Sequence, residues 1–412
     1  MGRNTRIIII GGGAAGMMAA IAAKSYGADV TILEKNPRVG KKILATGNGR
    51  CNFTNANADA TCFSGNNPKF VYSALSEFTV EETLKFFNRL GIEYKVEDLG
   101  KVFPMSDQAS SILDVLLYEL NRRNISIVCD ANVKEINSKG NGFIIRLENG
   151  KEYKSDKVII TTGGKAMPSS GSDGSGYELA RDLGHSITDV FPALVQIMLE
   201  GQYFKRIDGV KFLGTSHIIH KGKSIIKDRG DILFTNYGVS GPPILQISRK
   251  AGELLNQKEK AYVKLDMLDT MSSDEVRAII IRRFADNPEK TVEFSLVGLI
   301  NKRLIPVVLS EAGVEDIKRP VSALSTNEAE RIVNILKDWR FKIRGTKGWS
   351  SAQVTAGGVS TKEINPKTME SILVKGLYFA GEILDVDGKC GGFNLQWAWS
   401  SGFVAGINSA VG

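Results

Sequence analysis

Glycines and one carboxylate near the amino terminus are the residues whose types and spacing most directly predict chemistry. Four isoleucines at positions 7–10 run into Gly-Gly-Gly-Ala-Ala-Gly at positions 11–16, and Glu34 lies eighteen residues beyond the last of these glycines. Glycines at this spacing permit a tight turn, a close approach of the backbone to a pyrophosphate and close packing of a helix on a sheet. The first N–H groups of that helix attract phosphate, and the acid accepts hydrogen bonds from a ribose. The pattern therefore predicts a dinucleotide site, and the acid disfavours the 2′-phosphate of NADP there.

Three later segments carry the glycines and polar residues that are typical of ligand-binding loops. Residues 46–52 read Thr-Gly-Asn-Gly-Arg-Cys-Asn, and Thr-Gly-Gly at 162–164 follows an apolar strand. Near the carboxyl terminus, a second apolar strand ends in Gly381-Glu382, which places an acid at the edge of a sheet where doubly wound folds bind ligands. Residues 391–395 then precede a small-residue helix, and we expect the N–H groups at its start to face an anionic or electron-rich group.

The pattern of apolar residues predicts the elements that position these segments. Residues 1–50 form a βαβ unit, and the periodicity that follows predicts helices at 79–91, 110–123 and 177–183 and strands at 125–129, 131–136, 142–148 and 157–161. From residue 189 the residue pattern changes to short stretches in which apolar and polar residues alternate. We expect strands at 193–199, 210–213, 216–220, 225–228 and 231–235. Further helices are predicted at 273–286, 292–303, 326–338 and 397–407.

The fold class predicted from this order is α/β, with a Rossmann-type domain interrupted by an insertion. A chain of 412 residues exceeds one ordinary core, and the strand-and-glycine pattern returns near the carboxyl terminus. We expect the first part of the Rossmann-type domain at 1–190 and its completing part at 346–412. Between them we expect a β-rich substrate domain at 191–270, similar to an antiparallel β-barrel, and a helical subdomain at 271–345.

Composition indicates a soluble globular protein of a reducing compartment. Hydrophobic residues make up 42% of the chain, and no apolar run approaches the roughly twenty residues of a membrane span. The four cysteines, at 51, 62, 129 and 390, form no CxxC pair, which predicts a cytoplasmic location without a disulfide framework. The three histidines, at 185, 217 and 220, lack metal-ligand spacing, so we predict no metal site. Oligomeric state is not predicted.

The charge balance leaves two interpretations open. The chain has 53 Lys and Arg against 45 Asp and Glu, a net charge of +8. Because the charges are dispersed and form no long basic block, we favour a solvated surface that attracts anionic cofactors. A nucleic-acid partner is the less favoured alternative, and a basic face on the inserted domain would support it.

Long motifs across the chain resemble a known flavoprotein family. They lie at residues 42–55, 102–104, 353–359 and 391–402, in addition to the amino-terminal glycine turn. The set resembles the two-dinucleotide-binding-domain flavoproteins, and more closely the bile-acid-inducible-N (BaiN) type of NAD(P)/FAD-dependent oxidoreductase. Asn236 stands where many relatives are expected to carry His, which argues against a histidine acid or base at this position. We assign no catalytic residue.

The resemblance implies FAD as the cofactor, and the extra glycine-rich segments suit this longer ligand. The family pattern implies that pyrophosphate is held by Gly11, Gly13, Ala14, Ala15 and Gly16, ribose by Glu34 and Lys35, and adenine by the backbone of Val133. It implies that the flavin runs beside Lys41, Lys42, Thr46, Gly47, Asn48, Gly49, Arg50, Cys51 and Asn52. The same set of cofactor-binding segments includes Thr162, Gly163 and Gly164. The resemblance implies that the ribityl chain is reached by Gly381, Glu382 and Asp385. It implies that the pyrimidine side of the ring is approached by Gly391, Gly392, Phe393, Asn394 and Leu395.

The function implied is an FAD-dependent oxidoreductase that acts on a small organic substrate by hydride transfer through flavin N5. NAD(P)H is the expected reductant, as in reduction of a bile-acid enone, and it must reach the flavin without a second glycine fingerprint. The alternatives are an oxygen-using oxidase of an aminoketone or amine, an RNA-modifying or RNA-binding flavoprotein, and a flavin-binding sensor without turnover. Cys51 and Cys390 lack dithiol spacing, and Arg50, Tyr94 and Tyr237 are candidate donors to substrate.

Overall fold

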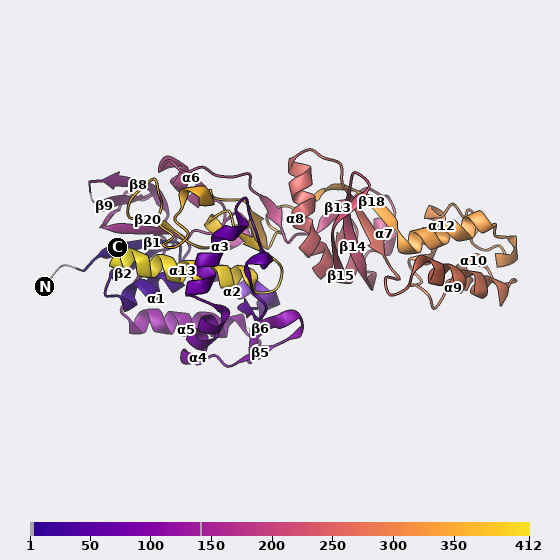
Figure 1. Cartoon of the computed structure of the whole chain (residues 1–412), viewed down its shortest axis with the longest axis horizontal. Coiled ribbons are helices and arrows are strands. Elements are labelled where there is room, and N and C mark those ends of the chain that lie inside the picture. Colours follow the sequence, from indigo (N-terminus) through magenta and orange to yellow (C-terminus); the bar gives the residue numbers. More distant parts are fainter. Residues whose placement is uncertain (1–3, 141) are drawn as a thin grey trace. The chain divides into compact units, whose positions relative to one another are not determined.

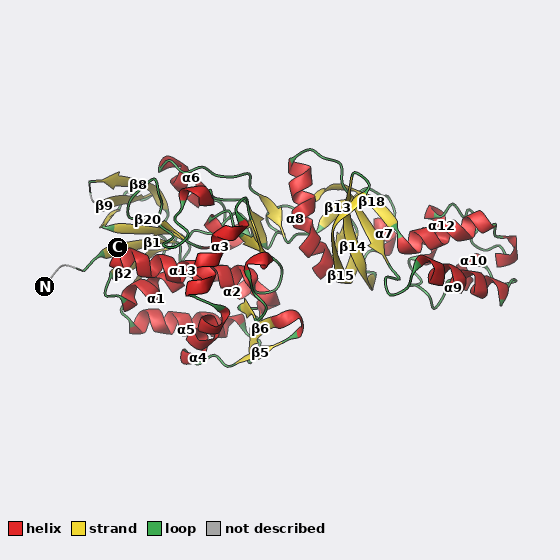
Figure 2. Ribbon diagram, viewed as in Figure 1, coloured by secondary structure: helices red, strands yellow, loops and turns green. Residues whose placement is uncertain are grey.

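The computed structural model describes residues 4–140 and 142–412, and the chain divides into two compact units. Unit 1 consists of Met1–Pro192 and Trp349–Gly412, and unit 2 consists of Ala193–Gly348. Figure 1 shows the chain coloured along its sequence, and Figure 2 distinguishes the helices from the strands in both units. Each unit has a hydrophobic core of its own.

The centre of unit 1 is a parallel sheet whose strands come from both ends of the chain. Its order is β20 (Leu377–Phe379), β11 (Lys157–Ile160), β1 (Arg6–Ile10), β2 (Asp29–Leu33) and β7 (Ser126–Val128). All four neighbouring pairs are parallel. The four isoleucines of β1 are buried, as expected for a strand covered on both faces.

Two helices from opposite ends of the chain pack on this sheet. α1 (Ala14–Ser25) follows β1, and α13 (Phe393–Val411) ends the chain beside it (Figure 1). Small residues allow the close packing, since a Cβ on Gly402 would lie 2.5 Å from the carbonyl oxygen of Ala15. The carboxyl-terminal segment therefore completes the domain that the amino terminus begins.

Shorter elements surround this centre. The helices are α2 (Lys41–Ala45), α3 (Val71–Glu77), α4 (Val80–Arg89), α5 (Ala109–Arg122) and α6 (Ser175–Asp182), with 3-10 turns η1 (Thr46–Gly49) and η8 (Gly381–Ile383). The strands are β3 (Thr54–Asn55), β4 (Phe63–Ser64), β5 (Tyr94–Val96), β6 (Lys101–Pro104), β8 (Val133–Lys139), β9 (Gly142–Leu147), β10 (Glu152–Ser155), β12 (Phe191–Ala193), β19 (Val354–Ala356) and β21 (Asp387–Gly388).

Unit 2 is a closed antiparallel barrel with an appended group of helices. The barrel order is β13 (Ile197–Leu199), β16 (Gly238–Ser240), β15 (Lys223–Thr235), β14 (Lys211–His220), β17 (Tyr262–Asp266) and β18 (Trp339–Thr346). Phe234, Trp339 and Phe341 pack together in its core. The helices are α7 (Phe204–Ile207), α8 (Pro242–Asn256), α9 (Ser273–Ala285), α10 (Val292–Ser295), α11 (Ile305–Glu311) and α12 (Thr326–Lys337).

The structure confirms the predicted fold class and corrects several elements. The four strands expected between 210 and 235 are two long strands, β14 and β15. Each strand continues through its glycine, because Gly214 and Gly230 pair with each other in the ladder. The helix predicted at 292–303 is only α10, since the chain turns at Gly298, where φ is +81°, and α11 begins afterwards. Helix α8 was not predicted. Within the described ranges, none of the helices combines the length and the apolar character that a bilayer crossing needs.

Candidate functional site

The turn between β1 and α1 leaves its backbone open at Gly13. A Cβ there would meet nothing within 4 Å, whereas one on Gly16 would lie 2.0 Å from the carbonyl oxygen of Gly11. Gly13 is the N-cap of α1, and no side chain caps the helix. The first N–H groups of a helix have no partner within it, so this start of α1 can receive an anionic group close to the backbone.

Glu34 lies at the end of β2 and is 7% exposed. Its Oε2 accepts a hydrogen bond from the N–H of Gly12 at 2.8 Å, and its Oε1 accepts two from Asn36, at 2.8 and 2.7 Å. A carboxylate has about four acceptor positions, so Oε2 retains one for a ribose hydroxyl. The N–H of Ala131 donates to the Glu34 carbonyl oxygen at 2.9 Å, which brings the start of β8, with Val133, to this end of the site.

Three lysines predicted from the family pattern follow β2 and contact later segments of unit 1. Lys35 forms an ion pair with Asp173 at 2.6 Å, and Lys41 donates to the carbonyl oxygen of Ser169 at 2.9 Å. Lys42 forms an ion pair with Glu382 at 2.6 Å, although 340 positions separate the two residues. Glu382 Oε1 also accepts a hydrogen bond from the N–H of Thr355 at 2.8 Å. These contacts hold α2, η8 and the 169–173 segment together.

Gly381, before the two carboxyl-terminal acids, lies against the start of α1. A Cβ on Gly381 would be 2.8 Å from the Cβ of Ala15, and the carbonyl oxygen of Gly381 accepts a hydrogen bond from the indole of Trp397 at 3.1 Å. Asp385 is buried and accepts a hydrogen bond from the N–H of Asn66 at 3.0 Å. Gly381 and its neighbours therefore join the edge of the site that Gly11–Gly16 begins.

The 46–52 loop is held by a group of charges. Arg50 Nε donates to Asp107 at 2.8 Å, its other guanidinium nitrogens pair with Glu97, and the guanidinium lies 4.0 Å from the centre of the Phe103 ring. Hydrogen bonds to Glu97 and Asp107 raise the pKa of Arg50, and the pKa values of both carboxyls are lowered, chiefly by hydrogen bonds from Arg50 to Glu97 and from Lys95 to Asp107. This pairing occupies Arg50, so it is not a free donor to substrate. Tyr94 lies on β5 and Tyr237 lies in unit 2.

The 46–55 and 391–396 segments meet. Asn55 Nδ2 donates to the carbonyl oxygen of Gly391 at 2.8 Å, and Thr54 Oγ1 donates to Gln396 Oε1 at 2.6 Å. Asn394 exchanges hydrogen bonds with the backbone of Gly388 at 2.8 and 2.9 Å. Gly392, the N-cap of α13, has a φ of +96°, and no side chain caps this 19-residue helix, so its first N–H groups have no partner within it. A Cβ on Gly392 would lie 2.8 Å from Asn52 Oδ1, which places the start of the helix next to the 46–52 loop.

Three buried hydroxyls around Thr162-Gly163-Gly164 have no hydrogen-bond partner among the residues described. They are Thr162 Oγ1, Ser172 Oγ and Tyr177 Oη. A Cβ on Gly176 would fall 1.9 Å from the Thr162 hydroxyl, and one on Gly164 would fall 3.1 Å from that of Tyr177. Burial, with the carboxylates of Glu382 and Asp385, raises the pKa of Tyr177, which keeps it a donor. Because buried polar atoms are normally paired, these hydroxyls fit a polar ligand. Ser172 and Tyr177 were not among the predicted site residues, although the glycine-rich run at 171–176 is a signal that could have indicated them.

Cys51 is completely buried, and burial raises the pKa of its thiol to about 12. A thiol with this pKa is an inert packing residue rather than a redox partner of Cys390.

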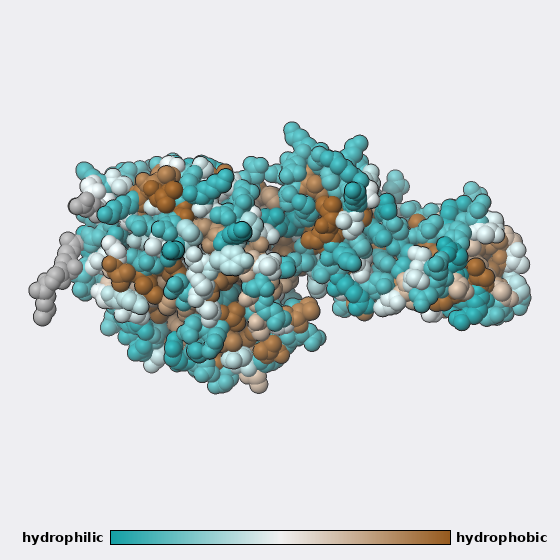
Figure 3. Space-filling view, viewed as in Figure 1, coloured by the Kyte–Doolittle hydropathy of each residue, from teal (hydrophilic) through white to brown (hydrophobic). Residues whose placement is uncertain are grey.

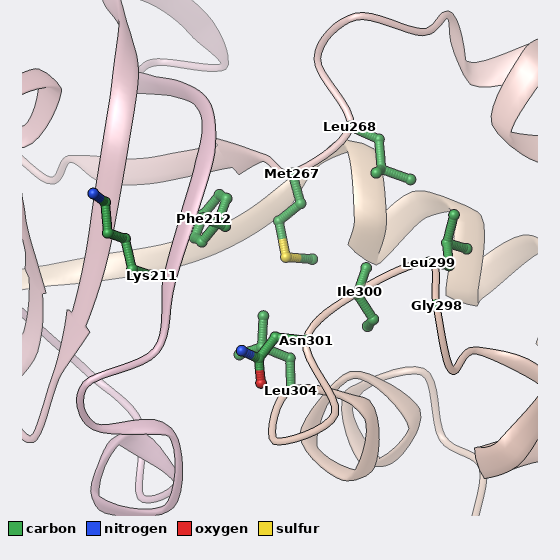
Figure 4. A pocket seen from close by; sticks show the side chains of 9 residues that line it. All are labelled: Lys211, Phe212, Met267, Leu268, Gly298, Leu299, Ile300, Asn301 and Leu304. Carbon is green, nitrogen blue, oxygen red and sulfur yellow. The ribbon is translucent and has the colours of Figure 1, made fainter.

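Unit 2 contains a separate cavity of about 340 Å³, shown in Figure 4. Its side chains are mostly apolar and come from β14, the two residues after β17 and the 298–304 segment. The lining residues are Lys211, Phe212, Met267, Leu268, Gly298, Leu299, Ile300, Asn301 and Leu304. Lys211 points its ammonium away from the apolar group (Figure 4) and pairs with Asp231 at 2.8 Å. None of the residues predicted for the flavin site lines this cavity.

Comparison with known proteins gives matches over nearly the whole chain. The model of the HI0933-like protein Rossmann domain family matches residues 5–408. The 3-dehydro-bile acid delta(4,6)-reductase of Clostridium scindens is 42% identical over 407 residues, which cover 98% of this chain and 99% of the relative. The ribosomal RNA dihydrouridine synthase of Escherichia coli is 32% identical over 399 residues, 96% of each chain. A flavocytochrome c3 fumarate reductase structure has a TM-score of 0.49 and 18% identity, covering 98% of this chain and 78% of that one.

Proposed function

The chain belongs to the HI0933-like Rossmann family, and on this basis we propose that it is an FAD-dependent oxidoreductase that reduces a carbon–carbon double bond conjugated to a carbonyl group. The observation that carries the proposal is the meeting of four distant segments: the first glycine turn, the 46–52 loop, the hydroxyls around 162–164 and the start of α13. Together they form one polar, glycine-lined edge along the parallel sheet.

The residues present fit FAD. The open backbone at Gly13 and the start of α1 would hold the pyrophosphate, and Glu34 Oε2 would accept a hydrogen bond from the ribose. The unpaired hydroxyls of Thr162, Ser172 and Tyr177 would donate to oxygens of the cofactor. The first N–H groups of α13 would stabilise negative charge at the pyrimidine edge of the ring. FAD, when bound, supplies a ring that accepts and passes on a hydride equivalent.

The substrate class is inferred from what the relatives have in common. One relative is named as a delta(4,6)-reductase of a 3-dehydro-bile acid, and two are named as ribosomal RNA dihydrouridine synthases. A 3-oxo bile acid with delta(4,6) double bonds and a uracil ring both offer a carbon–carbon double bond conjugated to a carbonyl, so reduction of this unit is the shared chemistry. We favour a small enone as the substrate, because the bile-acid relative has the higher identity, and NAD(P)H as the electron donor.

The absorption spectrum tests the cofactor and the donor. The purified protein, after addition of FAD, is expected to show a flavin band that bleaches when NADH or NADPH is added without oxygen and returns when a steroid 4-en-3-one is added. A protein that binds no FAD under these conditions would refute the proposal. Bleaching by an amine alone, with recovery and hydrogen peroxide formation in air, would instead establish an oxidase.

Reduction of uridine in RNA is the second candidate, favoured by the two full-length relatives of that name. The reduced holoenzyme, mixed with ribosomal RNA transcribed in vitro, is expected to form dihydrouridine if this candidate is correct, as measured by nucleoside mass spectrometry. Flavin reoxidation by the enone but not by RNA would decide for the small substrate, and the converse would decide for RNA.

A further inference from the structure

Almost all of the net positive charge of the protein lies in unit 2. Residues 193–348 contain 26 Lys and Arg against 19 Asp and Glu, a net charge of +7, whereas unit 1 has 27 against 26, a net charge of +1. Within unit 2, the barrel and α8 (residues 193–267 and 339–348) have 16 against 7, or +9, and the helical residues 268–338 have 10 against 12, or −2. The charge is thus concentrated on the barrel.

The ladder of the barrel aligns these charges in a row. Lys227 on β15 pairs with His217 on β14, His217 pairs with Lys264 on β17, and Lys264 pairs with Arg340 on β18. Cross-strand partners point to the same face, and strands lie about 4.8 Å apart, so three cations and the imidazole of His217 between them span about 14 Å of the outer surface. The lysines 227 and 264 lower the pKa of His217, after the larger effect of burial.

More cations continue this surface. Lys342 and Arg344 alternate with the buried Phe341 and Ile343 along β18. At the β14–β15 turn, Lys221 pairs with Glu259 at 3.3 Å, and this contact brings Lys258 and Lys260 beside the turn, which also carries Lys223. We call the following set the cationic face: Lys221, Lys223, Lys227, Lys258, Lys260, Lys264, Arg340, Lys342 and Arg344.

Acids neutralise only part of the cationic face. Asp338 pairs with Arg340 and Lys264, Glu200 with Lys342, and Glu259 with Lys221. Nine cations against these three acids leave a net charge of +6 on the face. Four of the nine cations are in these ion pairs. Among residues 4–140 and 142–412, no ion-pair partner is found for the other five, so five charges remain available to an external anion: Lys223, Lys227, Lys258, Lys260 and Arg344.

An exposed aromatic ring lies within this charge. Tyr262 on β17 is 38% exposed, and its cross-strand partner is Lys342. In Figure 3, hydrophilic residues cover most of the visible surface near β14 and β15. Cations on a sheet around an aromatic ring are the combination that binds single-stranded nucleic acid, since phosphates neutralise the cations and bases stack on the ring.

We propose that the cationic face of the barrel binds RNA. The face lies in unit 2, outside the residues that would hold FAD. The choice of RNA as the partner rests on the second candidate function, which is reduction of uridine in RNA. RNA is favoured over an acidic membrane because the row of charges lies on regular, evenly spaced strands with a stacking ring. Its net charge of +6 offers several phosphate contacts.

The test uses the full-length holoenzyme and a fluorescein-labelled single-stranded RNA of about thirty nucleotides. The variant K223Q/K227Q/R344Q removes three unpaired charges from the face, and the matched control K302Q/K362Q/K367Q removes three exposed lysines elsewhere. We expect the first variant to bind RNA at least tenfold more weakly at 0.1 M salt, with a slope of log K against log salt lower by about 2, since each phosphate contact to a single strand contributes about 0.7. The control is expected to stay within twofold of the parent.

Flavin content and flavin reduction by NAD(P)H, measured in the same samples, separate this proposal from the redox function. The charge-conserving variant K223R/K227R/R344K is expected to retain binding. The proposal is overturned if the parent binds no RNA, if the glutamine variant binds as the control does, or if the charge-conserving variant also loses binding. It is equally overturned if phosphatidylserine vesicles bind this face and RNA does not.

Discussion

Gly13 is the residue at which backbone geometry and ligand binding can be separated. It has a φ of −82°, which any residue adopts, and the space beside it is empty within 4 Å of a Cβ. Its glycine is therefore not required by the fold, in contrast to Gly16, where a Cβ would collide with the Gly11 carbonyl. We propose that the space at Gly13 receives the pyrophosphate of FAD.

The substitution Gly13→Ala should leave stability unchanged or slightly higher, and should weaken FAD binding by tenfold or more. The added methyl group would occupy the space through which the pyrophosphate approaches. Removing a glycine also lowers the conformational entropy of the unfolded chain, which stabilises the folded state by up to about 1 kcal/mol. Thermal unfolding of the apoprotein and fluorescence titration with FAD measure the two effects. Equal FAD affinity in parent and variant would show that the pyrophosphate lies elsewhere.

The thiol of Cys51 should resist alkylation at pH 8. Its pKa of about 12 leaves only about one molecule in ten thousand as the reactive thiolate, and its side chain is completely buried. Cys62, which is only partly buried, is the internal control. Mass spectrometry after treatment with iodoacetamide should find Cys62 modified before Cys51. Faster modification of Cys51 would contradict both its burial and its inert role.

At the scale of elements, the contact between α1 and α13 joins the first and last segments of the site. Gly402 and Gly406 of α13 lie against the carbonyl oxygens of Ala15 and Ala19. Any side chain at these positions must push α13 away from α1. Since the start of α13 belongs to the proposed FAD site, we expect packing of these helices and FAD binding to be coupled.

The substitution Gly402→Ala should destabilise unit 1 by about 1–3 kcal/mol, because its Cβ would lie 2.5 Å from the Ala15 carbonyl oxygen. It should also weaken FAD binding, although residue 402 is not a predicted ligand. Urea unfolding and FAD titration provide the measurements. Gly13→Ala is the matched control for stability, because it adds the same methyl group at a position with open space. Gly298 also has open space beside it, but its φ of +81° would add backbone strain to an alanine. An unchanged urea midpoint of the Gly402→Ala variant would contradict the close packing of α1 against α13.

Helix α12 of unit 2 has a cap that depends on pH. Glu328 and Ser325 form a reciprocal capping box, and Glu328 also pairs with Arg319. The hydrogen bonds from Ser325, then the contact with Arg319, lower the pKa of Glu328 from 4.5 to about 2. A carboxyl with a lowered folded-state pKa contributes stability above its unfolded pKa, and this contribution is lost as the pH falls from 4.5 towards 2.

The variant Glu328→Gln should therefore be less stable than the parent at pH 7 by about 1 kcal/mol, the usual size of a helix cap. The difference should shrink as the pH falls below about 4.5. Denaturant unfolding followed through the buried Trp339 of unit 2 measures it, with the exposed Glu315→Gln as the control for a general charge effect. A difference that stays constant down to pH 3 would contradict the cap.

At the scale of the whole molecule, the proposed FAD site and the cationic face belong to different units with different cores. The ends of unit 2 lie close together, since Ile197 pairs with Thr346 and the N–H of Lys347 donates to the carbonyl oxygen of Gln196 at 3.0 Å. An inserted unit with adjacent ends can be removed without stretching the domain that carries it.

Replacing residues 194–347 with a short Gly/Ser linker should leave a chain that folds and binds FAD. It should lose turnover of substrate and any binding of RNA, because specificity is expected in unit 2. Flavin content and circular dichroism check the first expectation, and the RNA titration checks the second. A shortened chain that is folded but takes up no FAD would show that unit 2 contributes to the cofactor site.

The sequence alone determined the fold class and the family. Both are confirmed, the first by the parallel sheet and the closed barrel, the second by the family match and a relative 42% identical. These features depend on local patterns: glycine spacing, strand and helix periodicity, and long motifs such as 42–55. The residues assigned to FAD and the domain boundaries remain predictions.

Only the tertiary structure decided which distant atoms meet and where charge gathers. The pairing of Lys42 with Glu382, the unpaired hydroxyls of Ser172 and Tyr177, and the row from Lys227 to Arg340 depend on packing and strand register. The same register made β14 and β15 continuous through their glycines. Local sequence fixes backbone preferences over a few residues, whereas contacts between residues hundreds of positions apart depend on how the whole chain packs.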